Sequence, residues 1–347
     1  MSAMPPDRGL LDHLIGIARS LAGEAGLSGA RAPTVLWDRP DGLVVRLGEV
    51  VVKAHAPDTD PGDFAARLRV ASSPLLRGVL LPPLLDPPLR EARGRLITAW
   101  PAGDPVSPED PDAAPWEDAA RLLARLHSTP LAALTAGGPL PRMGGPGRVA
   151  RAMARLRAAA ADRTPAKAAV ASVASVASVE SVERAFALLP AWAQGGAEDV
   201  QRAESTQRHA LVHGDWHLGQ VVHVPGARAA GLAPAGWQLI DIDDLGAGNP
   251  AWDLARPAAW YAAGLLPPEV WWRFLSTYRA SGGCAVPPDS DGDPWPSLDV
   301  PARALAVQSA ALAVAAASRD GRPLDEAEAA LVDACDRMVR VDALPAP

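Results

Sequence analysis

The chain has 347 residues, 48% of them hydrophobic and 21% charged, and a formal net charge of −7 at pH 7. This balance is typical of a globular protein long enough for two hydrophobic cores, and its negative sign disfavours a nucleic-acid partner. No apolar run approaches the roughly 18 residues of a membrane span, no signal-peptide pattern opens the chain, and the two cysteines lie far apart, so we expect a cytoplasmic protein with free thiols and no membrane partner.

The first hundred residues predict one helix followed by short strands. Residues 10–27 carry an apolar stripe at helical spacing. Residues 39–42 read Arg-Pro-Asp-Gly, a turn in which proline presets φ and glycine admits positive φ. Pro101-Ala102-Gly103-Asp104-Pro105 then interrupts regular structure. The predicted strands are 34–37, 43–47, 50–54 and 95–100, with a further helix over 63–70.

The remainder predicts helices. Residues 170–182 place a valine at every third position, a period that drifts around a helix and favours an exposed or loosely packed one. The other predicted helices cover 116–127, 268–279, 301–318 and 324–341.

Lysine is rare in this chain. Only Lys53 and Lys167 occur among 33 basic residues, and Lys53 lies within a β-type run, Val50 to Ala54. An ammonium is a compact point charge that suits phosphate oxygens, and arginine does not replace it. We therefore predict a phosphate contact at Lys53; the alternative is a strand lysine whose head group reaches solvent.

Two motifs carry the chemistry. The first is His213-Gly214-Asp215-Trp216-His217-Leu218-Gly219-Gln220, and the second is Leu239-Ile240-Asp241-Ile242-Asp243-Asp244. Phosphoryl transfer needs a carboxylate at the acceptor hydroxyl, together with an amide oxygen and a carboxylate on magnesium. The order H-x-D-x-x-x-x-amide, with a later aspartate, is that of a kinase catalytic loop and its metal-binding aspartate.

These motifs resemble those of the aminoglycoside phosphotransferase family, as does the segment from Gly246 to Ala255. The resemblance implies an α+β, bilobal protein-kinase-like fold with a small β-rich N-lobe and a larger, mostly helical C-lobe. The expected division is an N-terminal helical segment (1–29), a nucleotide-binding N-lobe (30–100), a hinge (101–105) and a helical C-lobe (106–347) that holds the catalytic loop and the acceptor site.

The resemblance also implies an ATP- or GTP-dependent kinase for a small hydroxylated molecule such as an antibiotic or a sugar. Asp215 would take the hydroxyl proton, Gln220 and Asp241 would hold Mg²⁺, and Lys53 would contact the α- and β-phosphates. The remaining implied residues are Ala99, Trp100 and Ala102, which would read the base through the backbone, and His213, Asp243 and Asp253, which would support the loop. Asp253 is also typical of a first helical turn, where the macrodipole favours an acid.

The sequence departs from the family in several places. Gln220 stands at the usual asparagine of the metal site and is one methylene longer. No glutamate lies between Lys53 and Glu91, so the usual partner of the lysine is missing, with Asp60 or Asp63 as candidate substitutes. The phosphate-covering hairpin has only Gly42, and Pro101 has no N–H, so Ala102 would have to donate to the base.

Two other functions fit parts of the sequence. A nucleotide-binding pseudokinase with a regulatory role is suggested by Gln220 and the missing glutamate. A metal hydrolase would use the histidines at 209, 213, 217 and 223, although Gly214 and Gly219 disfavour the helix that a zinc site at this spacing needs.

The charge distribution bears on the acceptor. Residues 1–104 carry 12 basic and 12 acidic side chains, so residues 105–347 hold the whole negative excess. This excess suits a cationic acceptor; the alternative is solubilising charge scattered over the surface.

Overall fold

The structure is a computed structural model that describes residues 8–24, 32–39, 42–85, 89–107, 109–162, 173–196, 209–225, 233–289 and 292–342. It confirms the α+β class. Two compact units are distinguished, and each is described by itself: unit 1 is Met1–Leu122, Thr129–Pro141 and Leu218–Asp243, and unit 2 is Leu123–Ser128, Arg142–His217 and Asp244–Pro347. The domain boundaries expected from the sequence stay a prediction. Lys167 and the centre of the turn at 39–42 lie outside the described residues.

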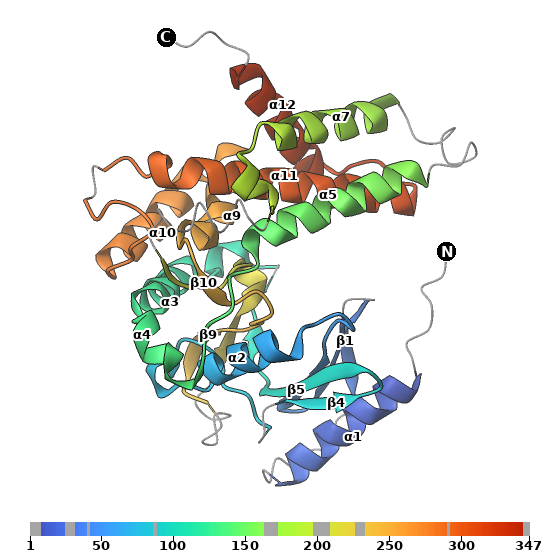
Figure 1. Ribbon diagram of the computed structural model, residues 1–347, viewed down its shortest axis with the longest axis vertical. Helices are drawn as coiled ribbons and strands as arrows, with labels where there is room; N and C mark the ends of the chain where they lie inside the picture. The colour runs from blue at the N-terminus through green and yellow to red at the C-terminus, as the bar shows by residue number, and fades with distance from the viewer. Residues whose placement is uncertain are drawn as a thin grey trace. The chain divides into compact units, whose positions relative to one another are not determined.

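Unit 1 is built around a five-stranded antiparallel sheet with the order β1-β2-β3-β5-β4 (Figure 1). Four of its strands confirm the predicted β-type runs, and β4 is a short addition that the sequence analysis missed. The bounds are β1 Thr34–Arg39, β2 Gly42–Leu47, β3 Val50–Ala54, β4 Arg90–Ala92 and β5 Arg95–Pro101.

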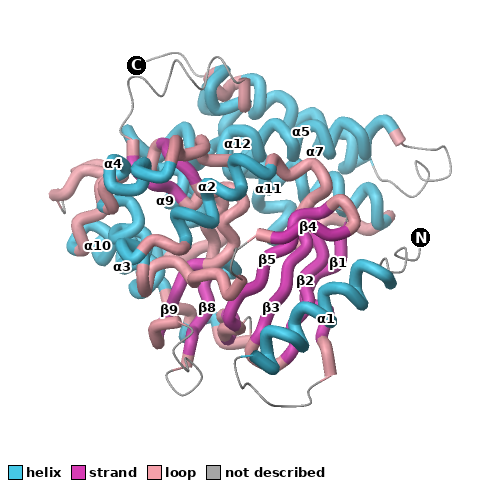
Figure 2. Tube along the Cα trace, turned by 60° about the horizontal axis from the view of Figure 1, so that its bottom comes forward, coloured by secondary structure: helices cyan, strands magenta, loops and turns pink. Residues whose placement is uncertain are grey.

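The period of two in these strands separates core residues from polar ones. Helix α1 (Arg8–Glu24) lies along the sheet in Figure 2 and buries Leu14 and Ala18 against it. The residues of β3 and β5 in this core are Val50, Val52, Ala54, Ile97 and Ala99. Alternation therefore turns Lys53, and its cross-strand partner Thr98, to the other face of the sheet.

Helix α2 (Pro61–Ala71) follows β3 and has a defined start. Asp60 is its N-cap and accepts a hydrogen bond from the backbone N–H of Asp63 at 2.8 Å, while Pro61 fits the first turn. Both aspartates thus lie at the start of this helix.

A second, three-stranded antiparallel sheet of unit 1 flanks the metal-site motif. It has the order β6-β8-β9, with β6 Asp104–Pro105, β8 Val221–Val224 and β9 Gly236–Leu239. β8 begins directly after Gln220, and β9 ends two residues before Asp241. Pairing of these two strands fixes both residues near one end of the sheet.

Unit 2 is mostly helical, as the sequence predicts (Figure 1). Helix α11 packs against α5, α7, α9 and α12 and forms its centre. The bounds of the helices are α5 Gly145–Ala161, α7 Val173–Ala187, α9 Ala251–Ala262, α10 Pro268–Ala280, α11 Trp295–Asp320 and α12 Glu326–Asp342. A short antiparallel pair joins β7 (Ala210–Val212) to β10 (Gly246–Gly248), and α3 (Trp116–Ser128) contains one of the boundaries between the units.

Helix α11 begins earlier than predicted. Its predicted start is Pro301, but the helix begins at Trp295, with Pro296 in its first turn and Pro301 inside. Among the described residues it is the one helix long and apolar enough to pass as a membrane span, yet 67% of that stretch is buried within the protein, as in a core helix.

The valine triplets lie partly in α7. Val176 is 50% exposed, whereas Val182 is fully buried, as expected for a three-residue period that drifts around the helix. Residues 163–172 lie outside the described residues.

Candidate active site

Lys53 stands between two carboxylates in unit 1. Its Nζ lies 2.8 Å from Oδ1 of Asp241 and 2.9 Å from Oδ2 of Asp243. Burial favours the neutral amine, but the two carboxylates outweigh it and raise the pKa of Lys53 above its usual value. Neither Asp60 nor Asp63 takes the place of the missing glutamate, because both belong to the start of α2. Asp243, 35% exposed, is the second anion at the lysine.

A buried histidine holds Asp243. Nδ1 of His55 lies 3.3 Å from Oδ2 of Asp243, and Nε2 lies 2.8 Å from Oγ1 of Thr98. Burial lowers the pKa of His55, although Asp243 opposes the shift, so the ring is neutral and can donate through Nδ1 and accept through Nε2. Burial disfavours the charged form of Asp243 and would raise its pKa, but Lys53 and His55 outweigh this effect and bring the pKa well below the usual range. The carboxylate is thereby fixed as an anion.

The two predicted magnesium ligands are neighbours. The amide Nε2 of Gln220 lies 3.3 Å from Oδ2 of Asp241, so the longer side chain reaches the carboxylate. Asp241 has φ +63°, a left-handed conformation that few non-glycine residues adopt and that concentrates at functional sites. Carboxylate and amide oxygens are the hard donors that Mg²⁺ prefers, and the Asp241 side chain is 33% exposed. The residues present therefore fit this ion.

Asp215 lies in unit 2, clamped by two arginines. Nη2 of Arg148 on α5 is 2.6 Å from Oδ2 of Asp215, and Nη2 of Arg256 on α9 is 2.9 Å from Oδ1. Arg148 also reaches Oδ2 of Asp244 at 2.7 Å. Burial raises the pKa of Asp215 above its usual range, and the two guanidinium groups oppose that shift. A raised pKa suits a group that accepts a proton during the reaction.

Asp253 organises the backbone of the loop. Its Oδ2 accepts the N–H of His213 at 2.7 Å, and its Oδ1 accepts the N–H of Gly214 at 2.9 Å. The same carboxylate lies 2.9 Å from Nε2 of His127, whose Nδ1 is 2.7 Å from the hydroxyl of Tyr278. Asp253 also lies in the first turn of α9, so this position carries both features that the sequence suggested.

Gly214 permits the close approach of two loops. It has φ +84°, and a Cβ there would lie 2.3 Å from the backbone oxygen of Asp244. Only glycine accommodates both conditions without displacement of the backbone.

The hinge region differs from expectation. The sequence predicts that the N–H of Ala102 reads the base, but this N–H donates to the backbone oxygen of Glu49 at 2.8 Å. The backbone oxygen of Ala99 accepts the N–H of Leu84 at 2.7 Å, and the indole of Trp100 donates to Thr98 at 2.9 Å. These groups are therefore engaged within unit 1.

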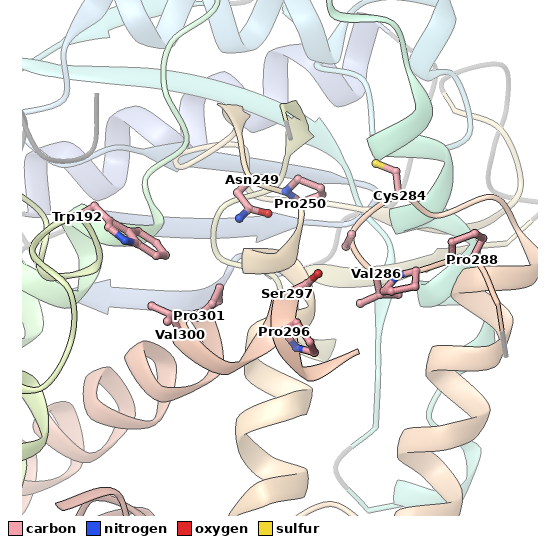
Figure 3. Close-up of a pocket in the computed structure, with 12 residues that line it drawn as sticks. Trp192, Asn249, Pro250, Cys284, Val286, Pro288, Pro296, Ser297, Val300 and Pro301 are labelled. Atoms are coloured by element: carbon pink, nitrogen blue, oxygen red, sulfur yellow. The ribbon is translucent and has the colours of Figure 1, made fainter. Parts of the chain in front are cut away.

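A cavity of about 410 Å³ lies elsewhere in unit 2 (Figure 3). Its walls come from the loop after α10, the first turns of α11, the turn before α9 and the short helical turn Ala191–Gln194, and they include Trp192, Asn249, Cys284 and Ser297. None of the predicted site residues lines it. Within the described part of the chain, no group of three or more His, Cys, Asp or Glu could hold a metal, so the hydrolase alternative gains no site.

The fold of this chain is similar to that of solved proteins. No protein-family model matches the sequence, and no curated protein matches it. A spectinomycin phosphotransferase, solved in complex with ADP and spectinomycin, is similar over 95% of this chain and 94% of its own, with 12% identity and a TM-score of 0.52. A thermostable mutant of an aminoglycoside phosphotransferase, solved as a ternary complex with ADP and hygromycin B, is similar over 95% of this chain and all of its own, with 14% identity and a TM-score of 0.51.

The fold is that of the aminoglycoside phosphotransferases. The resemblance stated from the motifs is thus confirmed for the fold of almost the whole chain, which includes α10, α11 and α12, where the sequence offered no motif.

Three residues around the site were not found from the sequence: His55, Arg148 and Arg256. Arg256 follows the Asp253 segment directly and gave a weak signal, since Asp253 and Arg256 are the two charged residues of α9. His55 lies two residues after Lys53, directly after the end of β3, and its N–H continues the ladder to Leu96, so period-two alternation alone could have indicated it. Arg148 gave no local signal.

Proposed function

We propose that this protein is a small-molecule kinase that moves the γ-phosphate of ATP or GTP to a hydroxyl group. The observation that supports the proposal most is the contact of Lys53 with Asp241, 188 residues apart, in a chain with a phosphotransferase fold. A lysine on an N-terminal sheet, paired with an aspartate that follows a later strand, is the arrangement that positions phosphates and their metal in kinases.

In the proposed reaction, Asp215 accepts the proton of the acceptor hydroxyl. As the acceptor oxygen forms its bond to the γ-phosphorus, the bond from phosphorus to the leaving nucleoside diphosphate breaks, and the hydroxyl proton passes to Asp215. Arg148 and Arg256 act as positioning residues, because they fix both carboxylate oxygens while each oxygen keeps a second lone pair for the hydroxyl. Catalysis would be mostly positioning and charge neutralisation.

Lys53 would contact the α- and β-phosphates, and Asp243, itself held by His55, would keep the ammonium in place. Gln220 and Asp241 would hold Mg²⁺, which when bound neutralises phosphate charge. A rotation of the Gln220 amide would present its oxygen in place of the nitrogen that now faces Asp241.

The acceptor is a small hydroxylated molecule, such as an aminoglycoside, another antibiotic or a sugar. Two features of this chain predict opposite charges for it. The negative excess of residues 105–347 favours a cation, whereas Arg148 and Arg256 at Asp215 favour an anionic group near the hydroxyl. A matched series of a hexose, its hexosamine and its hexuronate separates these predictions.

The test is nucleotide turnover with Mg²⁺ and a panel of hydroxylated acceptors, chosen by thermal shift and followed by mass spectrometry for a product one phosphoryl group heavier. We expect a phosphorylated acceptor whose formation requires Mg²⁺. Nucleotide binding without transfer to any acceptor would contradict the proposal.

That second outcome would support a nucleotide-binding pseudokinase with a regulatory role. Two observations favour this candidate: Gln220 in place of asparagine, and the engagement of the Ala102 N–H by Glu49. Both concern the nucleotide and its metal, and neither affects Asp215.

A further inference from the structure

The cavity of about 410 Å³ in unit 2 has the size and the walls of a small-molecule site (Figure 3). Ligand sites usually enclose about 300–1,000 Å³ and are lined mainly by apolar and aromatic side chains, with a few polar groups. Five of the twelve residues that line this cavity are prolines, whose fixed φ gives the walls little freedom. Walls of this kind are largely formed before a ligand arrives, which lowers the cost of binding.

The side chains around the cavity favour an uncharged ligand with flat rings. Trp192 offers an aromatic surface, and its ring stands edge-to-face against Trp252 at 6.4 Å between the ring centroids. Asn249, Cys284 and Ser297 add polar groups from three different walls. None of the described residues that line the cavity is charged, so an ion would lose its hydration there without a counter-charge. The lining therefore suits a neutral ring compound that carries a hydroxyl or amide group.

One wall of the cavity connects to Gly214 through a chain of buried hydrogen bonds. The N–H of Ala285 donates to the hydroxyl of Tyr278 at 3.0 Å, and that hydroxyl lies 2.7 Å from Nδ1 of His127. Nε2 of His127 lies 2.9 Å from the carboxylate of Asp253, which accepts the N–H of Gly214. Buried polar networks are rigid when their members are paired, so a change at the wall affects the support of Gly214.

A second wall reaches the same aspartate by a separate route. Oδ1 of Asn249 accepts the N–H of Ala251 at 2.9 Å. The backbone oxygen of Pro250 accepts the N–H of Asp253 at 3.2 Å. These two lining residues thus fix the first turn of α9, which carries Asp253. A ligand that holds both walls in place would therefore restrict Asp253 from two sides.

We propose that this cavity is a regulatory site for an uncharged ring compound, and that its occupancy orders the loop that Asp253 supports. The residues assigned to phosphate contact, metal binding and proton transfer do not line it. The inference therefore goes beyond the proposed function and does not depend on it. None of the measurements that test it requires phosphoryl transfer, so their failure would leave the proposed function standing.

The first experiment tests binding with a neutral probe and its charged counterparts. An engineered cavity of about 150 Å³ holds benzene, so the larger cavity of this chain leaves room for the two fused rings of β-naphthylmethanol. The matched ions are β-naphthoate and β-naphthylmethylammonium. In calorimetric titrations of the full chain, the alcohol should bind at least about tenfold more tightly than either ion. No binding of the alcohol, or equal binding of the three compounds, would overturn the proposal.

Two further measurements locate the bound probe. Val300→Trp fills the cavity from α11 and should abolish binding, whereas Val176→Trp, the matched substitution at an exposed position of α7, should leave binding unchanged. The probe should also slow alkylation of Cys284 by iodoacetamide, by about tenfold at about ten times its dissociation constant, while Cys335 is buried and serves as the internal control. Circular dichroism checks the folding of both variants. Unchanged binding in Val300→Trp would place the probe elsewhere and overturn the proposal.

Tyr278→Phe separates binding from coupling. The chain has two tyrosines, and Tyr261 stacks on an aromatic ring outside the hydrogen-bond chain, so Tyr261→Phe is the matched control. In wild type and Tyr261→Phe, the bound probe should slow amide exchange in the peptide that contains Gly214 by about fivefold or more. In Tyr278→Phe the probe should still bind but slow exchange less, because the hydroxyl between Ala285 and His127 is gone.

The exchange data also give the results that contradict the coupling. Exchange at Gly214 that does not change when the probe binds to the wild-type chain would overturn the regulatory role of the cavity. An equal slowing in Tyr278→Phe and in the control would overturn the assignment of the coupling to this hydrogen-bond chain.

Discussion

Nη2 of Arg256 lies 2.9 Å from Oδ1 of Asp215, and Arg256 belongs to α9, the same helix that carries Asp253. This contact sets the electrostatics of the loop that carries Asp215 as well as its geometry. Burial lowers the pKa of Arg256 and Asp215 opposes that shift, so removal of Asp215 would leave a buried guanidinium group without its counter-charge.

The pKa of His217 depends on the charges around this contact. The pKa of His217 is lowered to about 3, mainly by burial and further by the nearby side chains of Arg256, His213 and Arg148. We predict that its ring stays neutral from pH 8 to pH 5 in NMR titrations, and that Arg256→Gln raises its pKa. Because the unfolded chain protonates this histidine near its usual 6.5, the free energy of unfolding should fall as the pH drops from about 6.5 towards 3. A ring that titrates near 6.5 in the folded protein would contradict the arrangement of these cations.

Lys53 gives a second prediction. Lys53→Ala should lower kcat/KM for the nucleotide by about 10²-fold, the size of a lost charge-stabilising donor, and Lys53→Arg should not restore it. The reason is the geometry of Asp241 and Asp243, which enclose a single nitrogen at 2.8 and 2.9 Å and do not fit a planar fork. Circular dichroism is the control for folding. Full activity in the arginine variant would show that Lys53 is an ordinary strand lysine.

Substitutions at Gln220 distinguish a kinase from a pseudokinase. Gln220→Ala should raise the Mg²⁺ requirement and lower kcat, because an amide next to Asp241 is lost. Gln220→Asn keeps the chemistry with a shorter reach and should retain partial activity, since Mg²⁺ demands near-octahedral oxygens at about 2.0–2.1 Å. The measurement is turnover against Mg²⁺ concentration for the three proteins. An unchanged optimum and rate in Gln220→Ala would remove Gln220 from the metal site, and activity gained only in Gln220→Asn would identify a pseudokinase.

Gly214 gives a prediction for stability. Gly214→Ala should lower the free energy of unfolding by more than about 2 kcal/mol, because it combines a strained φ with a collision against the Asp244 backbone. Gly16→Ala is the matched control in α1, where a Cβ meets nothing within 4 Å, and should stabilise by roughly 0.5–1 kcal/mol. Thermal unfolding of both variants measures the two changes in stability. Equal changes would contradict the close approach of Gly214 to the backbone of Asp244.

The sequence predicted the parts of this fold that depend on local pattern. The β-type runs follow from alternation, the helices from helical spacing, and the motif aspartates from residue order. The structure bears out the strand that carries Lys53. Pro301 misled the prediction because proline usually opens helices, whereas here six earlier residues already form the helix.

The partners of the site residues could not be predicted in the same way. The contact between Arg256 and Asp215 joins residues 41 positions apart, and that between His55 and Asp243 joins residues 188 apart. Such pairs depend on the tertiary packing of whole elements, which no local pattern encodes. The use of the Ala102 N–H by Glu49 was hidden for the same reason.

The most direct test of the account compares wild type with Asp215→Asn in transfer of the labelled γ-phosphate to the acceptor found in the panel. The substitution keeps the shape of the side chain but removes the proton acceptor, so folding and nucleotide affinity should persist while turnover falls by about 10²-fold or more. Loss of transfer with unchanged nucleotide affinity is the predicted result. Transfer by Asp215→Asn at the wild-type rate would contradict the assignment of the proton to Asp215, and with it the proposed mechanism.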